Sequence, residues 1–193
     1  NVGVVGSGTM GAGIAQLLIQ NGYNTILYDI NEEAVNKATN NIFASLERLV
    51  VKKRLQAQEA EQSKRFLQTT VTMSALKDCQ LVIEAASENS DIKRSIFQGL
   101  EQICVKDAIF ATNTSSLSIT EISGQIDTPT RVAGLHFFNP APIMPLVEII
   151  AGLKTSDETI QTLVEFAQQI NKKPVVCKDT PGFVVNRVAR PFL

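Results

Sequence analysis

The sequence is poor in the residues that build disulfide frameworks, metal sites and membrane anchors. It has one histidine and three cysteines, Cys79, Cys104 and Cys177, which are odd in number and far apart. This spacing excludes a disulfide framework and a cysteine-based metal site, and the apolar surroundings predict buried thiols in a reducing compartment. No apolar run reaches the length of a membrane span, and the first residues lack the basic start of a signal peptide.

An excess of charge is also missing, because the formal net charge of the 193 residues is only −1. Such a balance gives no electrostatic footprint for nucleic acid or for an anionic membrane. We therefore expect neither partner, and a cytoplasmic location. A removed organelle-targeting segment stays open, because the sequence starts at Asn1, without a methionine, directly before a predicted core strand.

The composition that remains is that of an ordinary globular chain, with 44% hydrophobic and 19% charged residues. Its length suffices for one well-buried α/β domain and a small appendage. The strongest local pattern lies at the start, where NVGVV runs into GSGTMGAG and then into IAQLLIQN. This order predicts a buried strand, a glycine turn and a helix.

The turn carries the G-x-G-x-x-G spacing of a dinucleotide-binding site, with glycines at Gly6, Gly8 and Gly11. The first glycine permits a tight turn, the second lets a pyrophosphate approach the backbone, and the third allows the helix to pack on its strand. The amides at the helix start then face the phosphates. We count Thr9 and Met10, within the turn, with these glycines as cofactor-binding residues.

Asp29 decides which dinucleotide is expected. It ends a second predicted strand, 23 residues after Gly6, where a carboxylate can accept hydrogen bonds from both ribose hydroxyls of an adenosine and would repel a 2′-phosphate. No Arg or Lys follows in residues 30–33 to bind such a phosphate. The prediction is NAD and not NADP; the competing interpretation is a tight βα turn with a surface aspartate.

The remaining apolar runs predict an α/β fold of the Rossmann type, with a doubly wound, mostly parallel sheet. Further strands are expected at residues 69–72, 81–85, 108–112, 131–135, 146–150 and 174–177. Helices are expected after a cap at Asn31, at 58–67, from Asp91, near Ile119 and at 157–170. The helical pair at about 32–68 interrupts the βαβ rhythm. It is either a substrate arm or a solvated hairpin without chemical importance.

Two downstream segments hold the residues suited to catalysis. Asn113, Ser115 and Ser116 follow a predicted strand, at the edge of the sheet where ligands bind, although turn formation and helix capping would also explain them. His136 follows another strand, and Glu148 is an acid inside an apolar one. A buried carboxylate needs a partner. If the two strands pair across the proline turn, His136 and Glu148 meet as a general base and its carboxylate.

Along its whole length the chain resembles the NAD-binding domain of the (S)-3-hydroxyacyl-CoA dehydrogenases, a family that includes bacterial 3-hydroxybutyryl-CoA dehydrogenases. The segments that carry the resemblance are GSGTMGAGIA, ATNTSSLSITEI, GLHFFNPAPIMPLVEII and KDTPGFVVNR. The resemblance implies reversible oxidation of the 3-hydroxyl of an acyl-CoA to a ketone with NAD⁺. It also implies a general acid/base role for His136, with Glu148 as the carboxylate that orients it.

The resemblance assigns further roles residue by residue. Ser115 and Asn139 match residues that hydrogen-bond the substrate oxygen or steady the histidine, and Asn186 matches another polar residue of the site. Glu88 and Lys93 match positions near the nicotinamide. Ser45 and Lys52, on the helical arm, match contacts to coenzyme A, which favours the functional interpretation of the arm. Asn113 is counted with the cofactor-binding residues.

The resemblance also implies how the chain is organised. We expect residues 1–180 to form the NAD-binding domain and residues 181–193 to begin an all-helical second domain that the sequence cuts short. In the family that domain closes the acyl pocket and mediates dimerisation, so the full-length protein is expected to be a homodimer. Two rivals remain, a non-catalytic NAD(H)-binding module and a dehydrogenase segment of a multifunctional fatty-acid oxidation protein.

Overall fold

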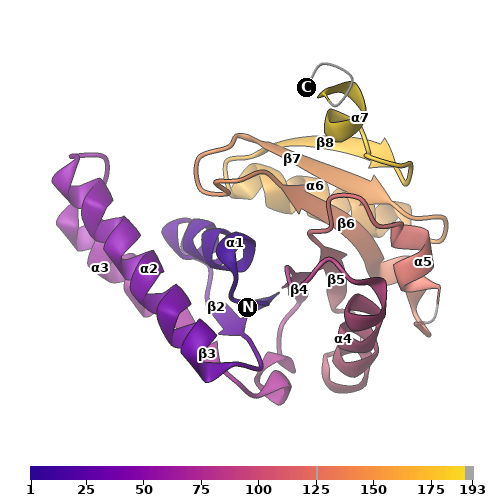
Figure 1. Ribbon diagram of the computed structural model, residues 1–193, viewed down its shortest axis with the longest axis horizontal. Helices are drawn as coiled ribbons and strands as arrows, with labels where there is room; N and C mark the ends of the chain where they lie inside the picture. The colour runs from indigo at the N-terminus through magenta and orange to yellow at the C-terminus, as the bar shows by residue number, and fades with distance from the viewer. Residues whose placement is uncertain (125, 190–193) are drawn as a thin grey trace.

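The strands form one eight-stranded sheet in the computed structural model, which describes residues 1–124 and 126–189 (Figure 1). The order across the sheet is β3-β2-β1-β4-β5-β6-β7-β8. The strands are β1 (Val2–Val5), β2 (Thr25–Tyr28), β3 (Leu67–Thr70), β4 (Leu81–Glu84), β5 (Ile109–Thr112), β6 (Val132–Phe137), β7 (Leu146–Ala151) and β8 (Lys173–Lys178). All neighbouring pairs are parallel except β6 and β7, which are antiparallel.

The chain changes direction across the sheet after β3, so β1 and β4 are neighbours although two strands separate them in sequence. In open α/β sheets the ligand crevice lies outside the carboxyl ends of the strands at such a switch point. Here those ends are Val5 and Glu84, which are paired in register. The topology therefore confirms the expected doubly wound, mostly parallel Rossmann-type sheet.

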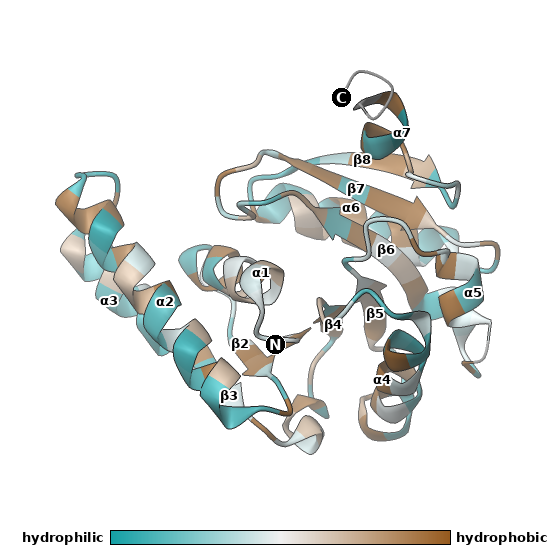
Figure 2. Cartoon of the chain, viewed as in Figure 1, coloured by the Kyte–Doolittle hydropathy of each residue, from teal (hydrophilic) through white to brown (hydrophobic). Residues whose placement is uncertain are grey.

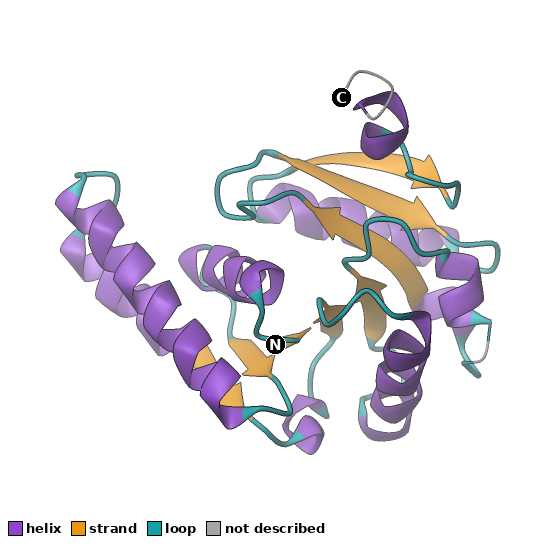
Figure 3. Cartoon of the chain, in the orientation of Figure 1, coloured by secondary structure: helices purple, strands orange, loops and turns teal. Residues whose placement is uncertain are grey.

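Helices cover both faces of the sheet (Figures 1 and 3). One apolar cluster joins the sheet to α1 (Thr9–Gln20), α2 (Glu32–Val51), α3 (Ala57–Arg65) and α6 (Asp157–Gln169). The other joins it to α4 (Ser90–Ile103), α5 (Ile119–Ser123) and the 3₁₀ turn Met73–Leu76; a second 3₁₀ turn spans Pro129–Arg131. Successive strand residues serve opposite clusters, as the pleat requires: Val4 and Ile83 belong to the first, Val5 and Val82 to the second.

The expected helical arm is present as the hairpin of α2 and α3, which packs on α1 and extends beyond the sheet (Figure 1). Asn31 caps α2 as predicted, because its side chain accepts a hydrogen bond from the Ala34 amide at 3.1 Å. Most of the arm is hydrophilic (Figure 2), while an apolar stripe that includes Ile42 and Leu46 is buried. The arm is therefore an amphipathic hairpin with a wide solvated face.

Two of the expected strands are displaced by two residues at one or both ends, and the other four differ by at most one residue at each end. The strand expected at residues 69–72 lies at Leu67–Thr70, because Leu67 pairs with Thr25 at the start of β2 and the helix before it ends at Arg65. The strand expected at 131–135 runs to Phe137, because the antiparallel pairing with β7 continues through His136 and Phe137. At the carboxyl end, the apolar segment forms α7 (Val185–Ala189), and residues 190–193 lie outside the described residues.

The expectations drawn from composition are confirmed in part. Cys79 is buried, but Cys104 and Cys177 are only half-buried, at positions packed against the second cluster. Burial raises the pKa of each thiol to about 11, so all three are protonated at neutral pH. Within residues 1–124 and 126–189, no helix combines the length and apolar character that a membrane crossing requires.

Candidate active site

A cleft of about 970 Å³ lies at the carboxyl ends of β1 and β4 and extends to the ends of β5 and β6. Most of the residues singled out from the sequence line it: Gly6, Gly8, Thr9, Met10, Asp29, Glu88, Lys93, Asn113, Ser115, His136, Asn139 and Asn186. Gly11 and Glu148 lie behind this lining, while Ser45 and Lys52 belong to the arm. The glycine turn and His136 therefore line the same cleft.

The three glycines of the turn meet different steric demands. Gly6 has φ +97°, and a Cβ there would come within 2.7 Å of the Ala85 carbonyl oxygen. A Cβ at Gly11 would lie 1.8 Å from the Gly6 carbonyl oxygen, whereas one at Gly8 would meet nothing within 4 Å. The first and third glycines therefore let the turn close on its neighbours, and the second leaves open space above the backbone.

This open space lies where α1 begins. The first backbone hydrogen bond of the helix runs from the Ala12 amide to the Gly8 carbonyl at 2.9 Å, so the amides of residues 9–11 have no acceptor within the helix. No side chain caps α1, and its first turn holds no acidic residue. Backbone amides without an acceptor, next to backbone that no side chain covers, can bind the pyrophosphate of a dinucleotide.

Asp29 is tied to the turn itself. Its Oδ2 accepts hydrogen bonds from the Ser7 amide at 2.7 Å and the Ser7 hydroxyl at 2.9 Å, and its Oδ1 accepts one from the Asn31 amide at 3.1 Å. A carboxylate has about four lone-pair sites, so one remains. The Ser7 hydroxyl can rotate to another acceptor, so contact of Asp29 with both ribose hydroxyls stays a prediction.

His136 and Glu148 face each other across the β6–β7 pair, in direct register. The Nδ1 atom of His136 lies 2.8 Å from Oε2 of Glu148. The other carboxylate oxygen, Oε1, accepts hydrogen bonds from the backbone amides of Val184 at 2.9 Å and Val185 at 2.8 Å. Glu148 is fully buried and His136 is 6% exposed, at the cleft. The carboxylate fixes Nδ1 as the protonated nitrogen and leaves Nε2 free to exchange a proton.

Ser115 connects three elements at the edge of the cleft. Its carbonyl oxygen accepts a hydrogen bond from the Asn186 side chain of α7 at 3.2 Å. Its amide donates to Oε1 of Glu88 at 2.9 Å, and the Thr114 hydroxyl donates to the same oxygen at 2.6 Å. Although burial raises the pKa of Glu88, these hydrogen bonds from Thr114 and Ser115 hold it below its usual value. Asn113 accepts a hydrogen bond from the Phe137 amide at 2.9 Å and so fixes the end of β6.

Lys93 lies under the cleft in a buried ion pair. Its ammonium group donates to both carboxylate oxygens of Glu84, at 2.8 and 2.9 Å, and lies 3.6 Å from Oε2 of Glu88. Glu84 also accepts hydrogen bonds from the Thr112 hydroxyl and the Ala86 amide, both at 2.7 Å. This network joins the ends of β4 and β5 to α4 beneath the cleft.

Residues 1–180 match the family model of the 3-hydroxyacyl-CoA dehydrogenase NAD-binding domain. The chain belongs to the 3-hydroxyacyl-CoA dehydrogenase family. It is 47% identical over 191 residues to a 3-hydroxyadipyl-CoA dehydrogenase of Escherichia coli, covering 99% of this chain and 40% of that protein. It is 44% identical to a 3-hydroxybutyryl-CoA dehydrogenase of Clostridioides difficile, covering 98% of this chain and 68% of that protein.

A solved structure shares the fold closely. The crystal structure of a 3-hydroxybutyryl-CoA dehydrogenase from E. coli K12 superposes with a TM-score of 0.98 at 47% identity, covering 100% of this chain and 41% of that one. The chain thus spans from about two fifths to two thirds of the length of these relatives. The part that it shares with the family is the NAD-binding domain.

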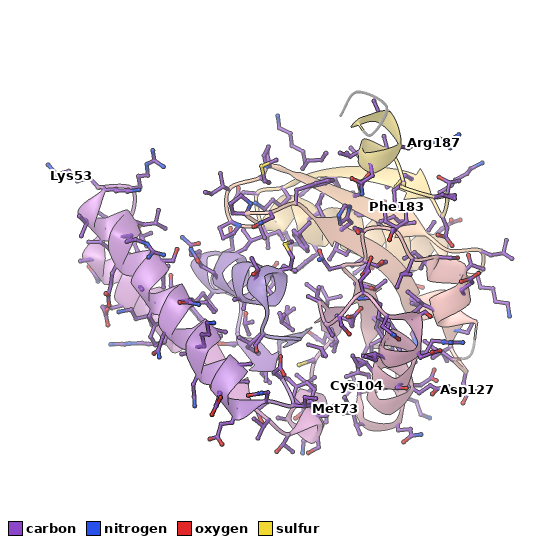
Figure 4. The ribbon with its side chains drawn as sticks, viewed as in Figure 1. Lys53, Met73, Cys104, Asp127, Phe183 and Arg187 are labelled. Carbon is purple, nitrogen blue, oxygen red and sulfur yellow. The ribbon has the colours of Figure 1, made fainter. Side chains whose placement is uncertain are left out.

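The residues that the family resemblance assigns to coenzyme A lie apart from the cleft lining. Ser45 is half-buried and Lys52 exposed on α2 and its end. Lys53, next to Lys52, marks the outer tip of the arm, far from the sheet (Figure 4). The structure therefore places these two residues on the arm and not beside His136, and their contact with coenzyme A stays a prediction.

Three features of this site were not predicted from the sequence. Ser7, inside the glycine turn, carries the hydrogen bonds to Asp29. Glu84 is an acid in an apolar strand, so the rule that singled out Glu148 would have found it as well. The two amides that bind Glu148 carried no sequence signal, because any non-proline residue offers one. Among residues 1–124 and 126–189, no group of three or more His, Cys, Asp or Glu side chains is placed to hold a metal ion.

Proposed function

We propose that the chain carries the cofactor-binding and catalytic groups of an NAD-dependent dehydrogenase. Its substrate is an (S)-3-hydroxyacyl-CoA, which is oxidised reversibly to the 3-oxoacyl-CoA. The observation that carries this proposal is the 2.8 Å contact between His136 and the fully buried Glu148, made at the cleft that the glycine turn also lines. Support for the substrate class comes from the family to which the chain belongs.

The residues of the cleft account for the proton in this reaction. His136 Nε2 accepts the proton of the substrate 3-hydroxyl, and Glu148, which holds Nδ1–H, stabilises the imidazolium that forms. The two backbone amides on Glu148 Oε1 keep that carboxylate in place. When bound, NAD⁺ supplies the hydride acceptor. The glycine turn and the amides at the start of α1 would hold its pyrophosphate, and Asp29 its adenosine ribose.

Replacing the base tests this assignment. The change His136→Gln should lower turnover by about 10²–10⁴-fold, because general acid–base catalysis contributes about that much. NAD⁺ affinity should be unchanged, because His136 is not among the residues proposed to hold the cofactor. The measurements are steady-state oxidation of a 3-hydroxyacyl-CoA and titration of the cofactor by fluorescence. Turnover equal to that of the unmodified enzyme would show that His136 is not the base.

The remaining assignments follow from the same proposal. Ser115, Asn139 and Asn186 line the cleft near His136 and would contact the substrate oxygen, with Glu88, Lys93 and Asn113 toward the nicotinamide. Ser45 and Lys52 would contact coenzyme A from the arm. Residues 1–180 would form the NAD-binding domain, and 181–193 would begin a helical domain through which the whole protein dimerises. A cytoplasmic location stays a prediction, because relatives in mouse and human are mitochondrial.

The rival without catalysis is an NAD(H)-binding module that kept the fold. It predicts cofactor binding without any reaction. Loss of NADH absorbance that depends on added acetoacetyl-CoA would exclude it. The other rival, a segment of a multifunctional protein, concerns the parent chain. Sequencing of the parent gene decides it.

A further inference from the structure

Phe183 lies in an unusual backbone conformation beside His136. It follows Gly182 in the turn between β8 and α7, and the two residues have φ +49° and +75° respectively. A bulky residue in the left-handed region is rare and costs free energy, so its surroundings must hold it there. The side chain is only 2% exposed and packs in the second apolar cluster. Figure 4 shows Phe183 beneath α7, on the side of that helix that faces the sheet.

The ring of Phe183 forms one wall of the histidine site. Its centroid lies 5.9 Å from that of His136, at an interplanar angle of 61°. A second ring, Phe138, lies 4.5 Å from His136 at 53°. Two aromatic rings thus pack against the imidazole, and a carboxylate holds Nδ1. Such contacts limit both tilting and flipping of the ring.

The residues that follow Phe183 bind the partner of His136. The amides of Val184 and Val185 donate to Oε1 of Glu148, whose Oε2 holds Nδ1 of the histidine. The start of the same turn is fixed by Asp179, which accepts hydrogen bonds from the Ser118 hydroxyl and the Thr120 amide, both at 2.8 Å. The turn therefore contacts both members of the pair, and its left-handed residues aim the two amides at the carboxylate.

We infer that Phe183 is a positioning residue for His136. Its ring holds the imidazole in the orientation in which Nδ1 donates to Glu148 and Nε2 faces the cleft, and its backbone delivers the amides that hold the carboxylate. The catalytic consequence rests on the proposed function of His136. The positioning itself does not, because it is a statement about the tautomer and orientation of one side chain.

The composition of the chain allows a direct test. His136 is the only histidine in the 193 residues, so ¹⁵N NMR of the imidazole reports on this one ring. Between the two neutral tautomers, we expect the Nδ1–H form to dominate. A hydrogen bond to a charged group favours one tautomer by roughly ten- to hundredfold.

Two variants remove the ring of Phe183 in different ways. Phe183→Leu keeps apolar volume and loses the aromatic wall, and Phe183→Gly keeps access to the left-handed backbone and loses the side chain. We expect either change to lower the ratio of Nδ1–H to Nε2–H by about tenfold, because a hydrogen bond weakens steeply when its alignment is lost. The matched control is Phe97→Leu, in the same apolar cluster, whose ring instead packs at a tilt against Phe110 with 6.1 Å between the centroids. It should lower the melting temperature and leave the ratio unchanged.

The outcomes separate the two proposals. A tautomer ratio equal to that of the unmodified chain in folded Phe183→Leu overturns the positioning role, whether or not Phe183→Gly folds. An equal fall of the ratio in Phe97→Leu would also overturn it, because general loosening of the core would then be the cause. If His136→Gln keeps its turnover while the Phe183 variants change the ratio, the proposed function fails and the positioning stands. In the intact enzyme, Phe183→Leu should lower kcat by about tenfold with the KM for NAD⁺ unchanged.

Discussion

Replacing Lys93 with methionine should destabilise the domain by about 3 kcal/mol. Glu84 is fully buried and Lys93 is 1% exposed, so the change leaves a carboxylate without its counter-ion in the interior. Removing one partner of such a pair costs about 3–5 kcal/mol. We expect the lower end, because Glu84 keeps two neutral donors, the Thr112 hydroxyl and the Ala86 amide, both at 2.7 Å.

Urea unfolding followed by circular dichroism measures this loss. With a denaturant slope of about 2 kcal/mol per molar urea, the midpoint should fall by about 1.5 M while the slope stays constant. A double-mutant cycle with Glu84→Gln isolates the pair. Since glutamine is neutral, the double variant should cost at least about 1.5 kcal/mol less than the sum of the single changes.

The surface ion pair of Lys64 provides the control. Lys64 lies 2.7 Å from Glu61 and 3.3 Å from Glu47, both of which are largely exposed. Lys64→Met should cost less than about 1 kcal/mol, as exposed pairs do. The reasoning would be refuted if Lys93→Met cost no more than this control. Single costs that add within about 0.5 kcal/mol would also refute it, because the two groups would then not be coupled.

Two further predictions concern the cleft. Gly11→Ala should lower stability by about 3 kcal/mol or more, because its Cβ would lie 1.8 Å from the Gly6 carbonyl oxygen. Gly8→Ala, whose Cβ meets nothing within 4 Å, should melt like the unmodified protein yet bind NAD⁺ at least about tenfold more weakly; calorimetry and cofactor titration on both variants check this pair. Hydrogen bonds keep the pKa of Glu88 low in the folded state despite burial. The ionised Glu88 side chain therefore stabilises the fold above the pKa of glutamate in the unfolded chain, about 4.3, and this stabilisation is lost as pH falls through the folded pKa. Urea midpoints measured from neutral pH down to about pH 3 should therefore fall more steeply for the unmodified protein than for Glu88→Gln; parallel curves would contradict the assignment.

The main features of the fold were predictable because their signals are local. Apolar runs mark the strands, and the glycine spacing marks the turn whose first and third positions admit no side chain. The pairing of His136 with Glu148 was predictable too, since a short proline-containing turn between two strands leads to antiparallel pairing, and a buried acid requires a partner. Strand ends were less predictable, because they depend on the neighbouring strand. Leu67 starts β3 because Thr25 starts β2.

What could not be predicted are partners brought together only by the folded chain. Ser7 has no feature that marks it as the donor to Asp29, because its amide and hydroxyl reach that carboxylate only in the folded turn. The left-handed conformation of Phe183 is likewise invisible in sequence, because phenylalanine is a residue that seldom adopts it. Such features depend on the summed packing of the surroundings, which no short window of sequence contains.

The two buried carboxylates of this chain show why burial alone does not identify a catalytic acid. Glu84 and Glu148 are both fully buried in strands, and each is hydrogen-bonded through both oxygens. The partner of Glu84 is a lysine, whose ammonium group donates to both carboxylate oxygens and so forms a structural ion pair. The partner of Glu148 is a histidine at the cleft, the side chain type that changes its charge near neutral pH. The chemistry of each site therefore follows from the partner of the carboxylate. A search for catalytic acids should rank buried carboxylates by the type of side chain to which each is hydrogen-bonded.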